Sequence, residues 1–180
     1  MAARIEIFAR GVGKTTESEL SIISAWNQEL FAPDKDIIEA FIWEDKRGLG
    51  FNIQSYLDDE LVGFAHVFVR KGLINDSAVL IGGLGSVMTA TKHQGSGIGS
   101  KTVEIANDVI LRNFRADLGV LLCKNTLVPF YEKLWWRRMQ RPVIINQPPE
   151  NIEWPHEAMI LLRHPNDNLP NKLDLCGLPF

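Results

Sequence analysis

Apolar and polar residues alternate along several short segments of this 180-residue chain, and the alternation predicts half-buried β-strands. The segments that predict strands are 3–9, 51–57, 61–70, 78–90, 117–123, 141–146 and 158–163. Asp58-Asp59-Glu60 predicts a tight turn, so the second and third strands should form a β-hairpin. Glycine interrupts residues 78–90, which indicates a bulge or a close backbone approach. The proline-rich segment 147–156 predicts irregular structure.

Apolar residues recur at helical spacing in four other segments. These segments are 16–31, 37–42, 98–110 and 126–136. Thr16 and Glu19 have the spacing of a capping box at the start of the first helix. Asn125 can cap the last helix, with Pro129 in its first turn. The resulting order, β-α-α-β-β-β-α-β-α-β-β, predicts a single α/β domain over residues 1–180, built around a mixed sheet.

The segment Gly13-Lys14-Thr15 follows a strand and precedes a helix, as the end of a nucleotide-binding P-loop does. That motif also needs glycine at position 8, where the loop must turn around a phosphate, and this chain has Phe8 there. The phosphate cradle is therefore incomplete. Gly11 and Gly13 are better explained as the turn between the strand and the capped helix.

The composition, 46% hydrophobic and 23% charged, is typical of a folded globular domain. The net charge of -3, from 19 basic and 22 acidic residues, provides no basic field for nucleic acid. Cys123 and Cys176 are the only cysteines, so we expect neither a disulfide framework nor a metal cluster. The absence of an N-terminal apolar h-region and of any 18-residue apolar run predicts a reduced cytoplasmic protein with no membrane partner.

The glycine-rich run Gln94-Gly95-Ser96-Gly97-Ile98-Gly99 lies between a predicted strand and a predicted helix. Small residues let the backbone approach a ligand closely, and the free N–H groups of a helix N-terminus bind anions. The dinucleotide fingerprint Gly-x-Gly-x-x-Gly does not fit, because its third glycine would fall on Ser100 or Thr102. The run therefore indicates a phosphate-bearing cofactor of another kind.

This run resembles the Gln/Arg-x-x-Gly-x-Gly/Ala motif of the GCN5-related N-acetyltransferase (GNAT) family, whose members transfer acetyl groups from acetyl-coenzyme A. Val87-Met88-Thr89 resemble the end of that family's fourth strand. The segment LGVLLCKNTLVPFYEKLWW, residues 118–136, resembles its fifth strand and the following helix. The resemblance implies the family's fold, a mixed and mostly antiparallel sheet of about seven strands flanked by about four helices.

The resemblance also implies a cofactor site on three segments: the end of the fourth strand, the glycine-rich loop, and the helix after the fifth strand. Its residues would be Val87, Met88, Thr89, Gln94, Gly95, Ser96, Gly97, Ile98, Gly99, Ser100, Asn125 and Phe130. Three lysines flank these segments and could meet the 3′-phosphate of coenzyme A, or could simply be solvated. They are Lys92, Lys101 and Lys124.

Tyr131 is the candidate general acid that the resemblance suggests. A phenol with a pKa near ~10 can protonate a departing thiolate whose thiol resembles cysteine, at ~8.5. The alternative is that Tyr131 is a core aromatic, because it has helical spacing with Leu127 and Leu134.

The chain departs from the family pattern at two places. Trp135 stands where glycine is usual, which puts the local turn in question. Residues 78–90 contain no acid, and Gly85 is about where many members carry a glutamate as general base. The base stays open among His66, His93, Glu44, Asp45, Asp174, the carboxylate of Phe180 and a water chain.

The C-terminal stretch NLPNKLDLCGLPF is similar, more faintly, to the tail of the aminoglycoside 2′-N-acetyltransferase branch. That similarity implies Asp174 and Phe180 as acceptor-binding residues, and Trp43 is a further candidate for an acceptor site. The acceptor would then be the primary amine of a small molecule. Acetylation of a polyamine, an amino acid or a protein N-terminus stays open, as do a non-catalytic coenzyme A-binding module and a homodimer.

Overall fold

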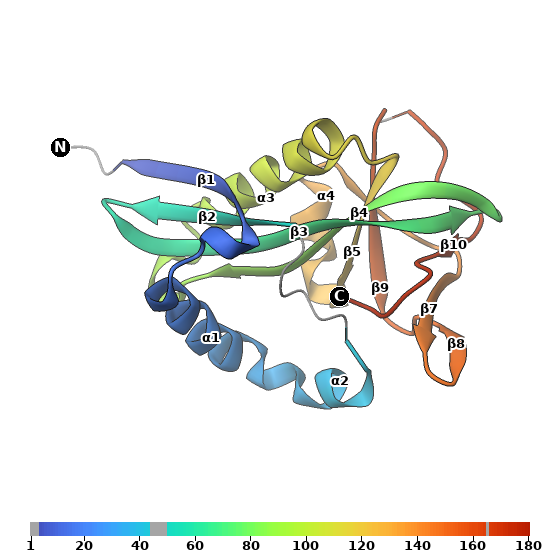
Figure 1. Cartoon of the computed structure of the whole chain (residues 1–180), viewed down its shortest axis with the longest axis horizontal. Helices are drawn as coiled ribbons and strands as arrows, with labels where there is room; N and C mark the ends of the chain where they lie inside the picture. The colour runs from blue at the N-terminus through green and yellow to red at the C-terminus, as the bar shows by residue number, and fades with distance from the viewer. Residues whose placement is uncertain (1–3, 44–49, 165) are drawn as a thin grey trace.

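The computed structural model describes residues 4–43, 50–164 and 166–180, and its strands form one mixed sheet (Figure 1). The strands are β1 (Ile5–Gly11), β2 (Phe51–Leu57), β3 (Glu60–Ile74), β4 (Ser77–Thr89), β5 (Leu118–Cys123), β6 (Trp136–Arg138), β7 (Val143–Gln147), β8 (Glu150–Glu153), β9 (Glu157–Leu162) and β10 (Leu173–Asp174). Their order is β6-β9-β5-β4-β3-β10-β7-β8, and β2 joins β1 to β3. The β4–β5 and β7–β10 pairs are parallel and the others are antiparallel.

Four α-helices flank this sheet within the described residues: α1 (Glu17–Phe31), α2 (Lys35–Ala40), α3 (Ile98–Asp108) and α4 (Val128–Glu132). Figure 1 shows α1 and α2 on one side of the strands and α3 on the other. Alternation along β2 explains this arrangement, because Ser55 meets Thr102 of α3 (2.7 Å between hydroxyl oxygens) while Tyr56 points to Glu19 of α1. The expected fold class is confirmed.

The strand count exceeds the expected seven because of three short strands, β6, β8 and β10, which no sequence pattern indicated. The prediction of irregular structure over 147–156 was wrong for Gln147 and Glu150–Glu153, because β7 and β8 pair as a hairpin there, and it is confirmed for residues 154–156. The last predicted helix was too long. Asn125 opens a 3-10 turn, α4 covers only Val128–Glu132, and the chain becomes β6 at Trp136.

Buried apolar side chains form two clusters, one on each side of the sheet. The first lies between the sheet and α3 and α4, and includes Val67, Val103 and Trp136. The second includes Phe68 and Phe180 and also takes in residues of β7, β9 and β10. By contrast α1 contributes no buried residue. Helix α1 therefore buries less apolar surface against the sheet than α3 does, and polar contacts help to hold it there.

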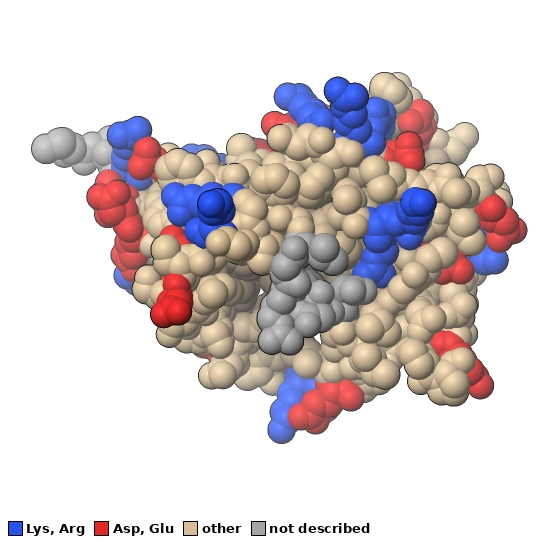
Figure 2. Space-filling model, viewed as in Figure 1, with Lys and Arg blue, Asp and Glu red and all other residues tan. Residues whose placement is uncertain are grey.

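Figure 2 shows basic and acidic side chains in small groups, several of them side by side, on a mostly uncharged surface. This distribution agrees with the small net charge of -3. Across the described part of the chain, no helix has the length and apolar character needed to cross a membrane.

Candidate functional site

The glycine-rich loop joins β4 to α3 through a 3-10 turn at Thr91–His93. Gly95 (φ +78°) and Gly97 (φ +84°) have left-handed backbone conformations, and a Cβ at either would meet nothing within 4 Å. The N–H of Lys101 donates to the carbonyl of Gly97 (3.2 Å) as α3 begins. The amides before Lys101 therefore have no partner inside the helix and can face an anion.

Three segments of the predicted cofactor site converge beside this loop. A Cβ on Gly99 would lie 3.1 Å from Thr89 Oγ1 and 3.8 Å from Phe130 Cζ. The end of β4, the first turn of α3 and helix α4 thus meet at a glycine. Gln94 ties the loop to β4, because its Nε2 donates to the carbonyl of Thr89 (3.2 Å).

The strands β4 and β5 diverge next to the same point. Their parallel ladder ends at the pair Leu84–Leu121, and no further pair between them is found in the described residues, although β4 continues to Thr89. On the other side, the β3–β4 register shifts between Phe64 and His66, and Ser86 has φ +51°. The expected bulge is confirmed, and it turns the backbone of residues 86–89 at the place where β4 leaves β5.

Tyr131 lies on α4, buried in the first core cluster at 5% exposure. Its ring meets Phe130 (centroids 4.9 Å apart) and Trp136 (6.4 Å) edge to face. Burial, followed by the nearby Cys123 thiol, raises the pKa of Tyr131 well above the ordinary value for tyrosine. The phenol is therefore protonated at neutral pH, which a proton donor requires.

Cys123 is the last residue of β5 and lies beside Tyr131. The pKa of its thiol shows how poorly this place solvates a negative charge on sulfur. Burial raises the pKa of the Cys123 thiol to about 12, and the charge of Glu157 adds to the shift while Arg138 opposes it. A thiolate in this place is thus poorly solvated and would take up a proton readily.

Two of the three candidate lysines are already paired. Lys92 contacts Glu60 (2.6 Å), and this hydrogen bond lowers the pKa of Glu60. Lys124 contacts Asp34 (2.5 Å), which links the segment after β5 to the start of α2. Lys101 is exposed on α3 and close to the loop. Asn125 is exposed too, and its carbonyl accepts from the N–H of Val128.

Among the base candidates, His66 lies nearest to the bulge, because it pairs with Gly85 across β3 and β4. It is 3% exposed, stacks on Phe68, and its Nδ1 lies 2.9 Å from Asn52 Oδ1. His93 is half-buried rather than exposed, and its Nε2 lies 4.0 Å from Glu60. Glu44 and Asp45 lie outside the described residues.

The three acceptor candidates occupy different surroundings. The ring of Phe180 is buried and meets Phe68 edge to face at 4.9 Å. Trp43 packs against the same cluster, and its indole N–H donates to the carbonyl of Ile38 (2.8 Å). The carboxylate of Asp174 accepts a hydrogen bond from the backbone N–H of Cys176 (2.7 Å), so one of its oxygens already stabilises the turn after β10.

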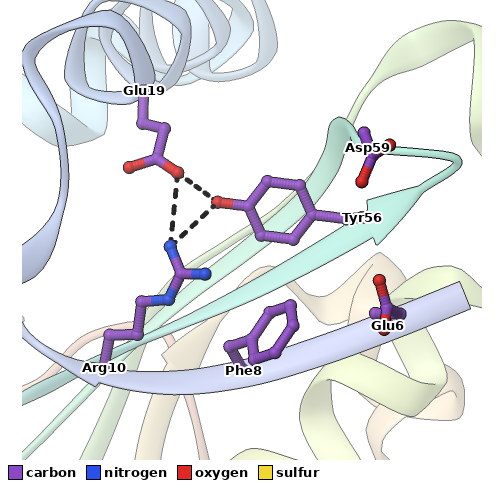
Figure 3. Close-up of a pocket in the computed structure, with 6 residues that line it drawn as sticks. All are labelled: Glu6, Phe8, Arg10, Glu19, Tyr56 and Asp59. Atoms are coloured by element: carbon purple, nitrogen blue, oxygen red, sulfur yellow. Dashed lines mark hydrogen bonds and ion pairs between the residues drawn. The ribbon is translucent and has the colours of Figure 1, made fainter.

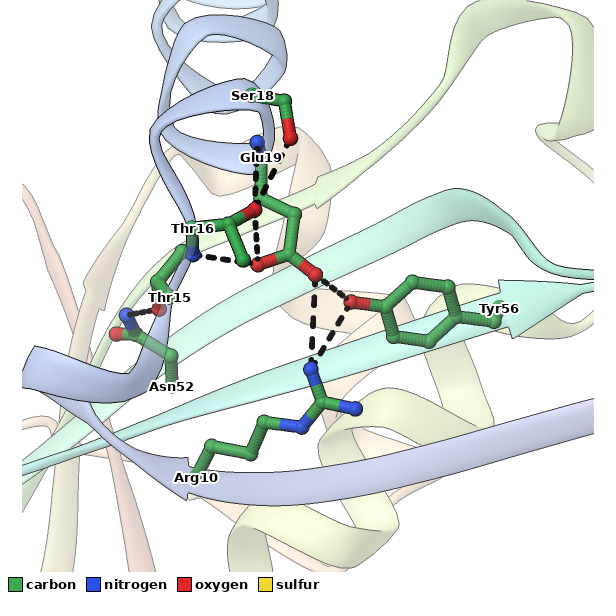
Figure 4. A network of polar contacts seen from close by, with 7 residues as sticks. All are labelled: Arg10, Thr15, Thr16, Ser18, Glu19, Asn52 and Tyr56. Carbon is green, nitrogen blue, oxygen red and sulfur yellow. Dashed lines mark hydrogen bonds and ion pairs between the residues drawn. The ribbon is translucent and has the colours of Figure 1, made fainter.

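Sequence reasoning missed a polar network that attaches α1 to the sheet (Figure 4). The capping box is present as expected, with Glu19 Oε2 accepting from Thr16 N (2.7 Å) and Thr16 Oγ1 (2.9 Å). The other oxygen of Glu19 accepts the hydroxyl of Tyr56 and lies 3.5 Å from the Arg10 guanidinium. The capping-box spacing could identify Glu19, but nothing local to it indicates partners on β1 and β2.

A cavity of about 240 Å³ opens beside this network (Figure 3). Its lining residues come from β1, α1, β2 and the β2–β3 turn, and they are Glu6, Phe8, Arg10, Glu19, Tyr56 and Asp59. The Arg10 guanidinium lies over the rings of Phe8 (4.7 Å to the centroid) and Tyr56 (5.6 Å), so the chain supplies its own cation to this aromatic pair.

A glycine-rich loop at a helix start and a bulged strand that diverges from its parallel neighbour are the features expected of acyl-coenzyme A-dependent N-acyltransferases. The model of the Acetyltransferase (GNAT) family matches residues 17–135, about two thirds of the chain. The chain therefore belongs to this family.

Solved structures with the same fold include Escherichia coli ElaA (14% identity, TM-score 0.61, covering 87% of this chain and 99% of that one). The N-acetyltransferase YhbS from Escherichia coli, in complex with CoA, has 13% identity and a TM-score of 0.59 over 97% of this chain and 91% of that one. Glucosamine-6-phosphate N-acetyltransferase from Arabidopsis thaliana has 14% identity and a TM-score of 0.51 over 73% and 90%. Comparison with curated protein sequences finds no match.

Acetyl-CoA is the cofactor of this family, and the glycine-rich loop fits its pyrophosphate. Gly95 and Gly97 leave open the space that a Cβ would otherwise take, in conformations that other residues rarely adopt. Phosphate oxygens can therefore approach the amides at the start of α3 closely.

Proposed function

We propose that this protein transfers an acetyl group from acetyl-CoA to a primary amine of a small molecule, by direct attack of the amine on the thioester. One observation carries the proposal: the glycine-rich loop, the bulged end of β4 and α4 meet at Gly99, where β4 has already diverged from β5. In the proposal, the amides of the loop, the part of the β4 backbone that β5 no longer pairs and the phenol of Tyr131 all act on one bound acetyl-CoA.

Acetyl-CoA supplies an activated carbonyl in its thioester. The amides of Gln94–Gly99 hold the pyrophosphate at the positive end of α3. Of the segment Val87–Thr89, the backbone N–H groups of Val87 and Thr89 face the side of β4 that β5 no longer pairs, because Met88 pairs with Phe64 of β3. In the proposal they polarise the carbonyl as an oxyanion hole does. These residues orient the reacting carbon at the end of β4.

Tyr131 donates the proton that the leaving thiolate requires. Burial raises the pKa of this phenol, which alone would weaken it as an acid. Burial also raises the pKa of the neighbouring Cys123 thiol, to about 12. A thiolate that left beside it would be a stronger base too, and would accept the proton of Tyr131 more readily than a thiolate in water.

For the acceptor, we propose an amino-sugar amine of the aminoglycoside type. Trp43, which is only partly buried, packs against the cluster on the side of the sheet that α1 and α2 cover, where it can line an acceptor site. The ring of Phe180 is buried in the same cluster, so the part of this residue that we propose for the acceptor is its terminal carboxylate. A structural neighbour is named a glucosamine-6-phosphate N-acetyltransferase, and glucosamine is an amino sugar. A polyamine, an amino acid, a protein N-terminus and a coenzyme A-binding role without catalysis are the alternatives.

Thiol release from acetyl-CoA tests the proposal when it is measured against aminoglycosides, polyamines, amino acids and short peptides. We expect release with an amino-sugar acceptor. Tyr131→Phe should then lower kcat by about 100-fold with little change in acetyl-CoA affinity, as loss of a general acid does. Tyr56→Phe is the matched control, because it makes the same change in the only other tyrosine and should keep kcat.

The outcomes separate the alternatives. Turnover that survives Tyr131→Phe removes Tyr131 from the mechanism. Release with another amine alone replaces the amino-sugar proposal. Binding of acetyl-CoA with no release from any amine favours the non-catalytic module.

A further inference from the structure

β1 forms an edge of the sheet, at the periphery in Figure 1. It pairs with β2 over seven residues without a register shift, and no other described strand pairs with it. Natural edge strands usually carry a bulge, a proline or charged side chains that discourage pairing with another chain. β1 has no bulge and no proline, and its charged side chains are Glu6 and Arg10. Its outer edge is therefore suited to accept another strand.

The hydrogen bonds at the two ends of β1 show which residues point outward. The carbonyl of Arg4 accepts from Asp58 N–H, and the N–H of Val12 donates to the carbonyl of Gly50. Even-numbered residues thus direct their backbone groups toward β2. Because the direction alternates along a strand, Ile5, Ile7 and Ala9 direct theirs to the open edge.

The side chains of β1 are complementary to a reversed copy of the strand. Glu6, Phe8 and Arg10 follow one another on one face, with the ring between two opposite charges (Figure 3). Phe8 is 39% exposed, and the side chains of Glu6 and Arg10 are 34% and 36% exposed. Arg10 uses one terminal nitrogen for Glu19 and Tyr56, which leaves other donors of its guanidinium for a second carboxylate.

We propose that β1 pairs antiparallel with β1 of a second copy of this chain, around a twofold axis at Phe8. In this register Ile7 of each copy opposes Ala9 of the other, and their outward backbone groups form the hydrogen-bonded pairs. Glu6 of each copy opposes Arg10 of the other, and the two Phe8 rings meet at the axis. The interface is isologous, as a closed dimer requires.

Charge selects this register over its neighbours. An axis at Glu6 or at Arg10 would oppose two like charges, and an axis at Ile7 would oppose Arg10 to Arg4. An axis at Ala9 would leave Glu6 opposite Val12, without a charged partner. An axis at Ile5 would pair Glu6 with Arg4 twice, but only the axis at Phe8 opposes β1 to β1 over its whole length, Ile5 to Gly11, and gives two opposite-charge pairs there. None of this depends on the proposed acetyl transfer.

Crosslinking tests the register. In a Cys176→Ser background, which removes the exposed native thiol, Phe8→Cys should form an intermolecular disulfide on mild oxidation. Two residues at the axis form a non-hydrogen-bonded pair with Cα atoms about 4.5 Å apart, within disulfide range. Ala9→Cys is the matched control and should not crosslink, because each Ala9 opposes Ile7. Crosslinking through Ala9→Cys, or none through Phe8→Cys, overturns the register.

Sedimentation measures the association itself, and we expect the unmodified chain to be a dimer. Ala9→Pro removes an outward N–H that β2 does not use, so it should raise the dimer Kd by roughly 10-fold or more while the fold is kept. Glu6→Lys should also raise the dimer Kd, because it places a positive charge opposite Arg10 of the second copy. Glu104→Lys makes an equal charge change at an exposed position of α3 and should leave the dimer Kd unchanged. A monomeric chain, or a dimer that Ala9→Pro leaves unchanged, overturns the proposal.

Discussion

At the scale of single residues, Glu19 has more partners than its position in a capping box would suggest. Burial raises the pKa of its carboxyl, but hydrogen bonds from Tyr56 and from Thr16 outweigh burial and hold the pKa at about 2. One side chain thus caps α1 and binds the helix to β1 and β2 (Figure 4). Because α1 buries no residue of its own, this carboxylate is a principal attachment of the helix.

Glu19→Gln should therefore lower the free energy of unfolding by about 1 to 3 kcal/mol, the range for charge-assisted hydrogen bonds. Urea unfolding at neutral pH measures the loss. Glu17→Gln is the matched control, since it removes an exposed acid from the same helical turn and should cost no more than about 0.5 kcal/mol. Equal effects of the two changes would contradict a special role for Glu19.

The pH dependence follows from the same carboxyl. The pKa of Glu19 falls from its ordinary value of 4.5 to about 2 on folding, so its contribution to the free energy of unfolding is fully present above pH 4.5. That contribution should be lost as the pH falls from 4.5 toward 2. The Glu19→Gln variant should lack this part of the acid-induced loss of stability. If the free energies of unfolding of the variant and the unmodified chain fell in parallel from pH 5 to pH 2, Glu19 would not be the group responsible.

Trp135 shows how a turn can survive the loss of its usual residue. The sequence put this turn in question because tryptophan replaces glycine, yet Trp135 takes φ +73°, a conformation that suits glycine. Its side chain is 73% exposed and contributes little burial in return. Left-handed conformations cost other residues about 1 to 2 kcal/mol. The turn is therefore retained at an energetic cost.

Trp135→Gly should accordingly relieve this strain, offset in part by the greater entropy of an unfolded glycine. We expect it to be about 0.5 to 1 kcal/mol more stable than Trp135→Ala, which removes the same ring and keeps the strain. Urea midpoints of the two variants make the comparison. An alanine variant at least as stable as the glycine variant would show that the backbone is not strained.

At the scale of elements, the structure around the glycine-rich loop makes a prediction about cofactor binding. Gly97→Ala puts a Cβ on a residue with φ +84° that precedes α3, in space that an anion would otherwise share. CoA affinity should fall by roughly 10-fold or more, and stability by about 1 kcal/mol. Gly13→Ala is the matched control, because Gly13 has equally open space and no positive φ.

Isothermal titration with CoA and urea unfolding measure both quantities for the two variants. Unchanged CoA affinity in Gly97→Ala would remove this loop from the cofactor site. A loss of affinity in Gly13→Ala would instead point to the segment that resembles the end of a P-loop.

Elements were predictable from sequence where their signal is local. Alternation identified the hairpin of β2 and β3, and glycine spacing identified the bulge near Ser86. The last helix was overestimated because its apolar spacing continues past Glu132, where the chain turns at Trp135 and pairs with β9. Pairing with a distant strand overrode local spacing, and no local pattern reports such a partner.

The candidate site was predictable to a similar extent. The loop at Gly95 and Gly97 was identified from residue type, because positive φ and close approach both require glycine. The pair formed by Lys124 and Asp34 joins segments ninety residues apart, so neither residue's own neighbourhood indicates it. Contacts of this kind decide which charged groups remain available to a ligand.

At the scale of the whole molecule, the C-terminal segment connects two parts of the sheet. β10 pairs with β3 on one side and with β7 on the other, so it joins the β7–β8 hairpin to the main sheet. Beyond it, the Arg70 guanidinium donates to the carbonyl of Leu178 and lies over the rings of Phe68 (5.3 Å) and Phe180 (5.5 Å). The position of the hairpin therefore depends on how the tail packs.

Phe180→Ala tests this dependence. The ring is 4% exposed, and a Cβ on Gly83 would lie only 3.1 Å from it, so the residue fills closely packed space. Replacement of a buried phenylalanine by alanine costs about 3 to 5 kcal/mol. If the tail unites the sheet, the free energy of unfolding should fall by that amount and the urea midpoint should fall with it, within one cooperative transition recorded both by tryptophan fluorescence and by circular dichroism. Trp135→Ala is the control for loss of an exposed ring and should cost far less. Two separate transitions in Phe180→Ala would mean that the hairpin unfolds independently of the main sheet, and an unchanged midpoint would mean that the tail does not pack against β3 in solution.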